Sequence, residues 1–405
     1  MTLIAQFIFW SSFSALIYTY IAYPLLAGFL ARRRKKINQS PVDDTNLPSV
    51  SVLMAVYNEE KVIEEKLQCL RELNYPKEKL SIFIGSDCSS DLTNDIITRL
   101  QPDFPRLFFF PFRKRQGKPG VVNQLAQKAL ERIPSVEQHI FLLTDANVIL
   151  EKNCLRNLTR HYRDKKVVIV DSNMVNTGLK KEGISQSENQ YISSEVQLKN
   201  DESNAWKIMA GPFGGCYTLR ASYFHPVPDN YLVDDFYITM KVIEQEGAVI
   251  NDLEAICYEA VSHEIKEEFR RKARISAGNF QNLVTFPHLW WPPYRLPGFV
   301  IFSHKVLRWI GPFLMIGLLA SALYLAFTIK STPFWHFFYQ VSILGVTTFL
   351  LVIPLLDKLL GVLGVHVLYL RSIRYFVLMN IALLKGFINF LKGIKNNVWE
   401  PTKRI

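Results

Sequence analysis

Apolar and polar residues divide the chain into two kinds of sequence. Residues 3–30 are almost continuously apolar, and residues 297–356 are apolar with few interruptions. Between them, residues 48–285 alternate short apolar runs with polar segments, which is the pattern of a globular domain. A run of about 20 apolar residues is long enough to cross a bilayer as a helix. The pattern therefore predicts a globular domain between membrane-spanning segments.

The first half of the globular region alternates between strand and helix patterns. Its β-forming runs end abruptly in polar residues, whereas the segments between them have apolar residues at helical spacing. The predicted strands are 49–56, 80–85, 107–110 and 139–143, and the predicted helices are 62–70, 92–100 and 119–132. This alternation predicts an α/β fold with a doubly wound, mostly parallel sheet flanked by transmembrane helices.

The second half of the globular region is less regular, and its patterns complete the division of the chain. It has a predicted strand at 167–170, helices at 184–200, 233–246 and 267–282, and a Gly-rich turn and strand at 211–219. Six segments follow along the whole chain: an N-terminal transmembrane anchor (1–31), a basic and polar cytoplasmic linker (32–47), the globular domain (48–285), an interfacial segment (286–299), two transmembrane helices (300–356), and interfacial or re-entrant helices with a basic tail (357–405). The last segment is predicted to be interfacial because Arg371, Arg374, Asn380 and Lys385 interrupt its apolar pattern.

The formal net charge of +11 lies beside the membrane segments. Arg32–Lys36 contributes +5 and the chain from residue 357 onward contributes +6, so the globular domain is close to neutral. A nucleic-acid-binding protein carries its excess charge on the binding domain, so nucleic acid is excluded as a partner. Basic flanks stay on the cytoplasmic side of a membrane. The charges predict a multi-pass protein of the cell (inner) membrane, with its N-terminus outside and its globular domain in the cytoplasm.

Polar side chains follow three of the predicted strands and place a ligand at one edge of the sheet. Asp145 and Asn147 are two residues apart after an apolar strand, so both point to the same side in an extended segment. Asp87 follows another strand, and Glu59 follows a third. The carboxyl edge of a parallel sheet is where ligands bind. A carboxylate and an amide oxygen suit a divalent cation held on a diphosphate, and the alternative is an Asx turn.

Five motifs with these residues occur in one order along the chain. They are Val56-Tyr-Asn-Glu-Glu60, Ser86-Asp-Cys-Ser-Ser-Asp91, Gly117-Lys118 with Asn123, Thr144-Asp-Ala-Asn147, and Val233-Asp-Asp-Phe236. Together they resemble membrane-bound family 2 glycosyltransferases of the cellulose/hyaluronan-synthase-like group, over about residues 49–279. Residues 303–309 and 399–404 are also similar to that group. The resemblance implies the A-type glycosyltransferase fold and a nucleotide-diphosphate sugar, such as a UDP-sugar, as donor.

The resemblance also implies a donor site. Tyr57 and Glu59 face the nucleoside, Asp87 lies near the uracil or ribose, and Lys118 is a point charge for the phosphates. Helix capping is the alternative for Asp87 and for Asp91, and a solvated position in a basic loop is the alternative for Lys118.

A divalent cation, Mg²⁺ or Mn²⁺, is implied as the cofactor. Asp145 and Asn147 stand where the family often has Asp-x-Asp, and the Asn removes one negative charge from the site. His263 is a candidate for a further ligand, and a packed or surface histidine is the alternative. We therefore expect the protein alone to bind the metal weakly.

Asp235 matches the base of the family, which takes the proton of the acceptor hydroxyl. The adjacent Asp234 raises the cost of ionising both carboxyl groups, and the alternative is two acids at a helix N-terminus. Many processive members carry Gln-x-x-Arg-Trp on the following helix, but residues 270–276 here lack the Gln and the Trp. Arg271 and Arg274 are candidates to clamp the diphosphate, and processivity is left open.

The predicted function is an inverting glycosyltransferase at the cytoplasmic membrane. It moves a sugar from the nucleotide-diphosphate donor to a growing polysaccharide or a lipid-linked acceptor. One alternative is transfer to polyprenyl phosphate, which is already ionised and needs no base. The other is a non-catalytic membrane protein that senses nucleotide sugars or acts as a scaffold.

Overall fold

The computed structural model describes residues 1–34, 47–179, 184–261, 264–329, 333–394 and 397. Three predictions lie outside these residues. They concern His263, most of the linker after Arg34, and the motif at 399–404.

An eight-stranded mixed sheet forms the centre of the globular domain, in the order β3-β2-β1-β4-β7-β6-β8-β5. Its strands are β1 (Ser49–Val56), β2 (Leu80–Asp87), β3 (Leu107–Phe112), β4 (His139–Thr144), β5 (Val148–Leu150), β6 (Val167–Thr177), β7 (Cys216–Arg220) and β8 (Ala248–Ala260). The predicted parallel half is confirmed, because β3, β2, β1 and β4 pair in parallel. Beyond β4 the sheet is mixed: β7 runs antiparallel to both β4 and β6 and β5 runs antiparallel to β8, whereas β6 and β8 pair in parallel.

Helices cover both faces of the sheet, as the doubly wound prediction requires. Alternate residues of β1 enter different cores: Val52 and Met54 pack with α3, α4, α6 and α7, whereas Leu53 and Ala55 pack with α5, α8 and α9. The helices are α3 (Ile63–Glu72), α4 (Thr93–Leu100), α5 (Gly117–Leu130), α6 (Cys154–Thr159), α7 (Ser185–Trp206), α8 (Asp234–Glu244) and α9 (Ile265–Thr285).

The long strand β8 and the extension of β6 to Thr177 were not predicted. Polar residues interrupt the apolar pattern of both strands, and Asp171, Asn251 and Asp252 are buried. The β6–β8 register also shifts between Asp171 and Asn173, which breaks the two-residue alternation. Buried polar residues and an irregular register therefore hide these strands from a pattern-based prediction.

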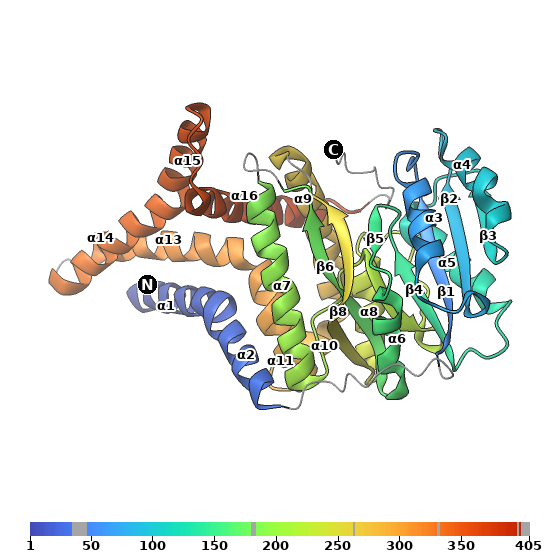
Figure 1. Ribbon diagram of the computed structural model, residues 1–405. Coiled ribbons are helices and arrows are strands. Elements are labelled where there is room, and N and C mark those ends of the chain that lie inside the picture. The colour runs from blue at the N-terminus through green and yellow to red at the C-terminus, as the bar shows by residue number, and fades with distance from the viewer. Residues whose placement is uncertain (35–46, 180–183, 262–263, 330–332, 395–396, 398–405) are drawn as a thin grey trace.

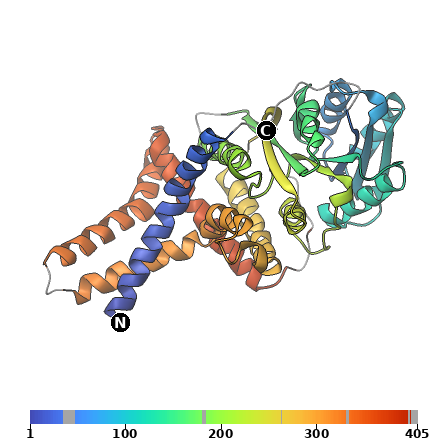
Figure 2. The ribbon, with the colours of Figure 1, turned by 90° about the horizontal axis from the view of Figure 1, so that it is seen from below.

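The membrane part extends from one side of the domain as a set of helices (Figure 1). Among the described residues, four helical segments are long and apolar enough to cross a membrane: Thr2–Arg33, Gly311–Thr328, Pro333–Val362 and Leu368–Leu391. They comprise α1 (Thr2–Ile17), η1 (Tyr18–Ala22) and α2 (Tyr23–Arg33), then α13 (Gly311–Thr328), then α14 (Pro333–Thr347), η8 (Thr348–Val352) and α15 (Ile353–Val362), and finally α16 (Leu368–Leu391). In the view from below, α1 and α13 lie side by side in this arm (Figure 2).

α16 is one continuous helix, whereas the sequence predicted broken interfacial or re-entrant helices. It packs along α9, and Ser276 donates a hydrogen bond to the Leu383 carbonyl at 2.9 Å. Near its start Ser372 contacts α7, and beyond its end Asn397 lies against Gly117 of α5. A helix that crossed the bilayer would end on the side opposite its start. α16 contacts the domain near its start and beyond its end, and it is also long and apolar enough to span, so its interfacial position stays a prediction.

A buried polar network joins the domain to the membrane helices. Its interfacial elements are α10 (Pro287–Trp290), α11 (Leu296–Ile301), η7 (Phe302–Val306) and α12 (Leu307–Trp309). His304 of η7 is fully buried and contacts Glu202 at 2.8 Å and Glu195 at 3.0 Å, both on α7. Tyr23 of α2 donates a hydrogen bond to Glu202 at 2.7 Å. The network ties α7 to the first membrane helix.

Candidate active site

Asp145 lies at the carboxyl end of β4, where the sheet changes from parallel to antiparallel pairing. Its backbone N–H donates to the Gly215 carbonyl at 3.0 Å, so the turn before β7 lies directly beside it. Its carboxylate pairs with Lys118 of α5, with Nζ 2.7 Å from Oδ1. Lys118 Nζ also lies 3.4 Å from the Gly214 carbonyl. Lys118 and Asp145, predicted to share a site, are therefore in contact.

Electrostatics keep Lys118 charged. Burial disfavours its ammonium, but the carboxylates of Asp145, Asp234 and Asp235 outweigh that effect and raise its pKa above the ordinary value. A cation surrounded by three carboxylates can contact a phosphate oxygen without losing its proton.

Asp87 holds the start of the helix that carries Lys118. Its side chain is fully buried and accepts hydrogen bonds from the backbone N–H groups of Gln116 at 2.6 Å and Gly117 at 3.1 Å. Arg115 Nε donates to the same carboxylate at 3.0 Å. Asp87 thus binds the N-terminus of α5, the favourable end of a helix for an anion. The predicted contact with a uracil or ribose stays a prediction.

The nucleoside candidates Tyr57 and Glu59 lie after β1 in a turn that interlocks with the start of α4. The Arg115 guanidinium stacks over the Tyr57 ring, 3.3 Å from its centroid. The Glu59 backbone N–H donates to Thr93 Oγ1 at 2.8 Å. Asp91 accepts hydrogen bonds from the backbone N–H groups of Glu60 and Thr93, so it makes the capping contact given as its alternative. Arg115 therefore connects the Tyr57 turn to Asp87.

Asp234 and Asp235 begin α8 on the other side of Gly214. Asp234 is buried, and a Cβ at Gly214 would lie 2.6 Å from Asp235 Oδ2. Burial and the neighbouring Asp234 raise the pKa of Asp235 to about 7, while Lys118 acts in the opposite direction. A carboxyl group with this pKa is half ionised near neutral pH, which suits a general base.

The candidate metal ligands Asp145 and Asn147 are near each other, but they do not form a closed metal site. Asn147 donates through Nδ2 to Glu259 at 3.1 Å, and one Asp145 oxygen contacts Lys118. Among the described residues, no group of three or more His, Cys, Asp or Glu side chains is arranged to hold a metal. The second carboxylate oxygen of Asp145 and the amide oxygen of Asn147 remain for a hard cation. They would fill only two positions of its coordination shell.

The structure separates the two predicted diphosphate clamps. Arg271 pairs with Glu188 at 2.6 Å and with Glu268 at 2.8 Å, so two carboxylates already neutralise it. Arg274 extends from the same helix into a cavity described below. Burial lowers the pKa of Arg274, while Asp234, Asp145 and Asp235 raise it, so it lies within electrostatic reach of the candidate base. The clamp stays a prediction for both arginines.

Sequence reasoning missed Lys66, which supports the turn after β4. It is fully buried on α3, and Nζ donates to Thr144 Oγ1 at 2.8 Å and to the Val148 carbonyl at 2.5 Å. These acceptors lie on either side of Asp145 and Asn147, so Lys66 holds both ends of the turn. Burial lowers the pKa of Lys66. The sequence did contain a signal for this role. Lys66 stands at helical spacing among the apolar residues of α3, whereas an exposed lysine would stand on the polar face of the helix.

We expect Lys66→Ala to destabilise the protein by about 2–5 kcal/mol, since it leaves a cavity and two buried acceptors without a donor. Lys66→Met keeps most of the side-chain volume, so it should destabilise the protein less than Lys66→Ala does. Thermal unfolding in detergent measures both, with exposed Lys61→Ala as the control. Equal midpoints for Lys66→Ala and Lys61→Ala would contradict a supporting role.

Comparisons with known proteins show which families and folds this chain resembles. Residues 51–224 match the family model for glycosyl transferase family 2. A probable glycosyltransferase, YdaM of Bacillus subtilis, is 39% identical over 80 residues, which are 19% of each chain. The beta-monoglucosyldiacylglycerol synthase of Trichormus variabilis is 30% identical over 125 residues, 30% of this chain and 25% of that protein. These curated relatives are thus matched over about a quarter of their length or less.

One solved structure shares the fold over nearly the whole chain. It is the mannosyltransferase PcManGT from Pyrobaculum calidifontis in complex with GDP-Man and Mn²⁺, with a TM-score of 0.66 and 20% identity. The match covers 96% of this chain and 98% of that chain, so it includes the membrane helices. The fold is therefore that of an A-type nucleotide-sugar transferase with attached apolar helices that are long enough to cross a membrane.

Proposed function

We propose that this protein, of which residues 51–224 match the family model for glycosyl transferase family 2, is an inverting glycosyltransferase of the cell (inner) membrane. Its donor is a nucleotide-diphosphate sugar, and its acceptor is a growing polysaccharide or a lipid-linked glycan. The observation that carries this proposal is the position of Gly214 between two groups: Lys118, which pairs with Asp145, contacts its carbonyl, and Asp235 lies against its Cα. This arrangement supports the proposal, because a candidate phosphate-binding lysine and a candidate base lie around one turn.

Asp235 removes the proton from the acceptor hydroxyl as the oxygen attacks the anomeric carbon. The bond from that carbon to the donor diphosphate breaks on the opposite face, which inverts the configuration. The electron pair leaves on the nucleoside diphosphate, and the Lys118 ammonium stabilises that negative charge. The Arg115–Tyr57 stack supplies a flat surface beside Asp87 for the nucleoside. The raised pKa of Asp235 keeps its basicity matched to neutral pH.

When bound, Mg²⁺ or Mn²⁺ would supply further positive charge that stabilises the negative diphosphate. Asp145 and Asn147 would hold it through one oxygen each, and the donor phosphates would complete its shell. The mannosyltransferase with the same fold was solved with GDP-Man and Mn²⁺, which supports the assignment. The Asp145–Lys118 pair keeps the site oriented before the donor binds.

We expect Mn²⁺ and nucleotide diphosphate to bind cooperatively. The protein alone supplies one carboxylate and one amide, so the affinity for Mn²⁺ should rise at least about tenfold when the nucleotide is present. Calorimetric titration of Mn²⁺ with and without UDP or GDP measures this. Equal affinities, or full turnover in excess EDTA, would contradict a metal shared with the donor.

Turnover of radiolabelled nucleotide sugars in purified membranes tests the function as a whole. A panel of UDP- and GDP-sugars identifies the donor, and loss of signal in the Asp235→Asn variant assigns the product to this protein. Transfer to polyprenyl phosphate predicts full activity in that variant, because an ionised acceptor needs no base. A non-catalytic sensor predicts donor binding without product.

A further inference from the structure

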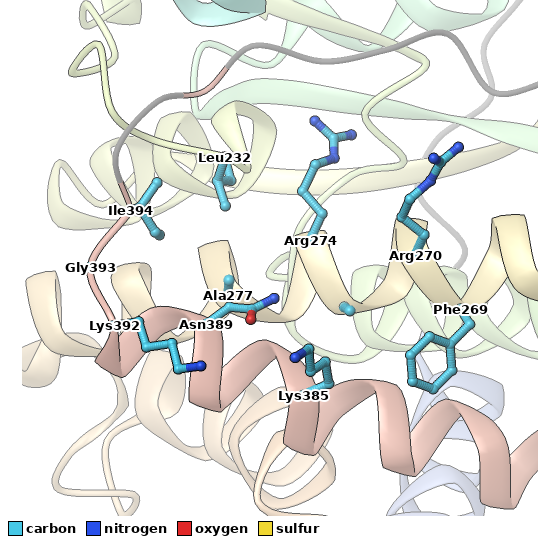
Figure 3. A pocket seen from close by; sticks show the side chains of 11 residues that line it. Leu232, Phe269, Arg270, Arg274, Ala277, Lys385, Asn389, Lys392, Gly393 and Ile394 are labelled. Atoms are coloured by element: carbon cyan, nitrogen blue, oxygen red, sulfur yellow. The ribbon is translucent and has the colours of Figure 1, made fainter.

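A cavity of about 560 Å³ lies between α9, the C-terminal half of α16 and the loop before α8 (Figure 3). This volume is within the range of small-ligand pockets, roughly 300–1,000 Å³. Leu232 forms part of its wall, three residues before the candidate base Asp235. The cavity is therefore close to the candidate active site but is built on a different pair of helices.

Basic side chains dominate the polar lining of the cavity. Arg270 and Arg274 extend from α9, Lys385 lies on α16, and Lys392 directly follows the last residue of α16. The described lining contains no Asp or Glu. Arg270 pairs with Glu267 at 2.6 Å, but in the described parts of the chain no ion pair reaches the other three cations. In Figure 3, Arg270 and Arg274 extend from one side of α9, whereas Lys385 and Lys392 lie together on its α16 side. Two lysines without a carboxylate partner form a site for an anion with several negative oxygens, such as a phosphate.

The surroundings indicate that the anion belongs to a lipid. Lys385 and Lys392 lie on one side of α16 together with the exposed apolar residues Ile381 and Ile388. An exposed apolar stripe bordered by basic residues is the pattern of a helix at the membrane interface. The contacts that α16 makes with the domain near its start and beyond its end agree with such a position. A phosphate in the cavity could thus continue into an acyl or prenyl chain along this stripe.

We propose that this cavity binds the phosphate that joins lipid to glycan in a lipid-linked acceptor. Lys385 and Lys392 contact the phosphate, and Arg274 lies between it and the carboxylates of Asp234 and Asp235. The terminal sugar then extends past Leu232 to the base. This inference rests on the proposed glycosyl transfer and names the acceptor class.

The test measures binding of farnesyl diphosphate to the full-length protein in detergent, apart from turnover. Lys385→Gln/Lys392→Gln should weaken binding about tenfold or more, because two charged contacts are lost. Lys385→Arg/Lys392→Arg should restore it to within about threefold, since the charges remain. The matched control, Lys165→Gln/Lys166→Gln, removes the same charge from an exposed turn and should leave binding unchanged. Unchanged binding in the Lys385→Gln/Lys392→Gln variant would overturn the proposal.

Three further probes identify the source of the phosphate. Farnesol and inorganic pyrophosphate should each bind at least about tenfold more weakly than farnesyl diphosphate, because each lacks half of the predicted contacts. If pyrophosphate binds as tightly as farnesyl diphosphate, the site binds free phosphate. If phosphatidylglycerol micelles compete with farnesyl diphosphate at equal concentration, the site binds anionic lipids in general. Either result overturns the acceptor assignment.

UDP and GDP binding separates this proposal from the proposed function. The Lys385→Gln/Lys392→Gln variant should bind both nucleotides as the wild type does. Weaker nucleotide binding would give the cavity to the donor and overturn the proposal. Failure of the proposed function has a different signature, namely no transfer from any nucleotide sugar while farnesyl diphosphate still binds.

Discussion

Asp235→Asn is expected to lower turnover by about 100-fold or more, which is the usual size of a general-base contribution. The amide keeps the shape of the side chain beside Gly214 but cannot accept the hydroxyl proton. Donor affinity should hardly change, because Asp235 faces the acceptor rather than the nucleotide. Initial rates with the radiolabelled donor, together with nucleotide titrations, measure both quantities. If the substitution mainly raised the donor dissociation constant, the base would have to be another group.

The pH profile gives this prediction an independent control. The pKa of Asp235 is raised to about 7, so the carboxyl group is protonated below that pH and ionised above it. Wild-type turnover should therefore fall as the pH drops through 7 and level off at higher pH. Asp234→Asn removes the neighbouring negative charge and should move the midpoint to lower pH. A midpoint that stays in place would show that Asp234 does not tune the base.

Asp145→Asn is expected to weaken donor binding in Mn²⁺ by roughly 10- to 100-fold, the range found when support for a metal site is lost. The variant removes the only carboxylate among the candidate ligands in the described residues. Without metal, the same change should leave nucleotide binding unchanged or tighter, because it removes a negative charge near the diphosphate and frees Lys118 from its ion pair. Titrations of UDP and GDP in Mn²⁺ and in EDTA compare the two conditions.

A charge-matched control is Asp103→Asn, at an exposed position of the short 3-10 helix Gln101–Asp103, where it pairs with Arg71. It should bind nucleotides as the wild type does in both conditions. Equal losses for Asp145→Asn with and without metal would assign Asp145 to folding or to positioning Lys118, and would remove it from the metal site.

Local patterns of the sequence were sufficient for the elements that carry the candidate site. β1 has its predicted bounds, 49–56, because one apolar run is buried on both faces and ends in polar residues. Asp87, Lys118, Asp145 and Asp235 all lie at the ends of elements whose position follows from such runs. The two-residue period of a strand and the 3.6-residue period of a helix are local properties, so they are readable without the fold.

Contacts between distant segments required the tertiary structure. The motif predicts a nucleoside contact for Asp87, and only the structure shows that its carboxylate also binds the start of α5, 29 and 30 residues later in the chain. Arg271 was assigned to a diphosphate, yet Glu188, which is 83 residues away, neutralises it. Lys66 had no motif at all. Which partner satisfies a buried charge depends on the packing of several elements, and no spacing along the chain encodes that packing.

By itself, the sequence determined the globular domain between membrane segments, the parallel half of the sheet and the motifs that resemble family 2 glycosyltransferases. These features depend on runs of neighbouring residues. The tertiary structure alone decided the antiparallel strands β5 and β7, the buried course of β8, the continuous helix α16 and the basic cavity that it forms with α9. Each of these arises where distant elements meet, because burial and charge pairing there are set by the assembled fold rather than by local periodicity.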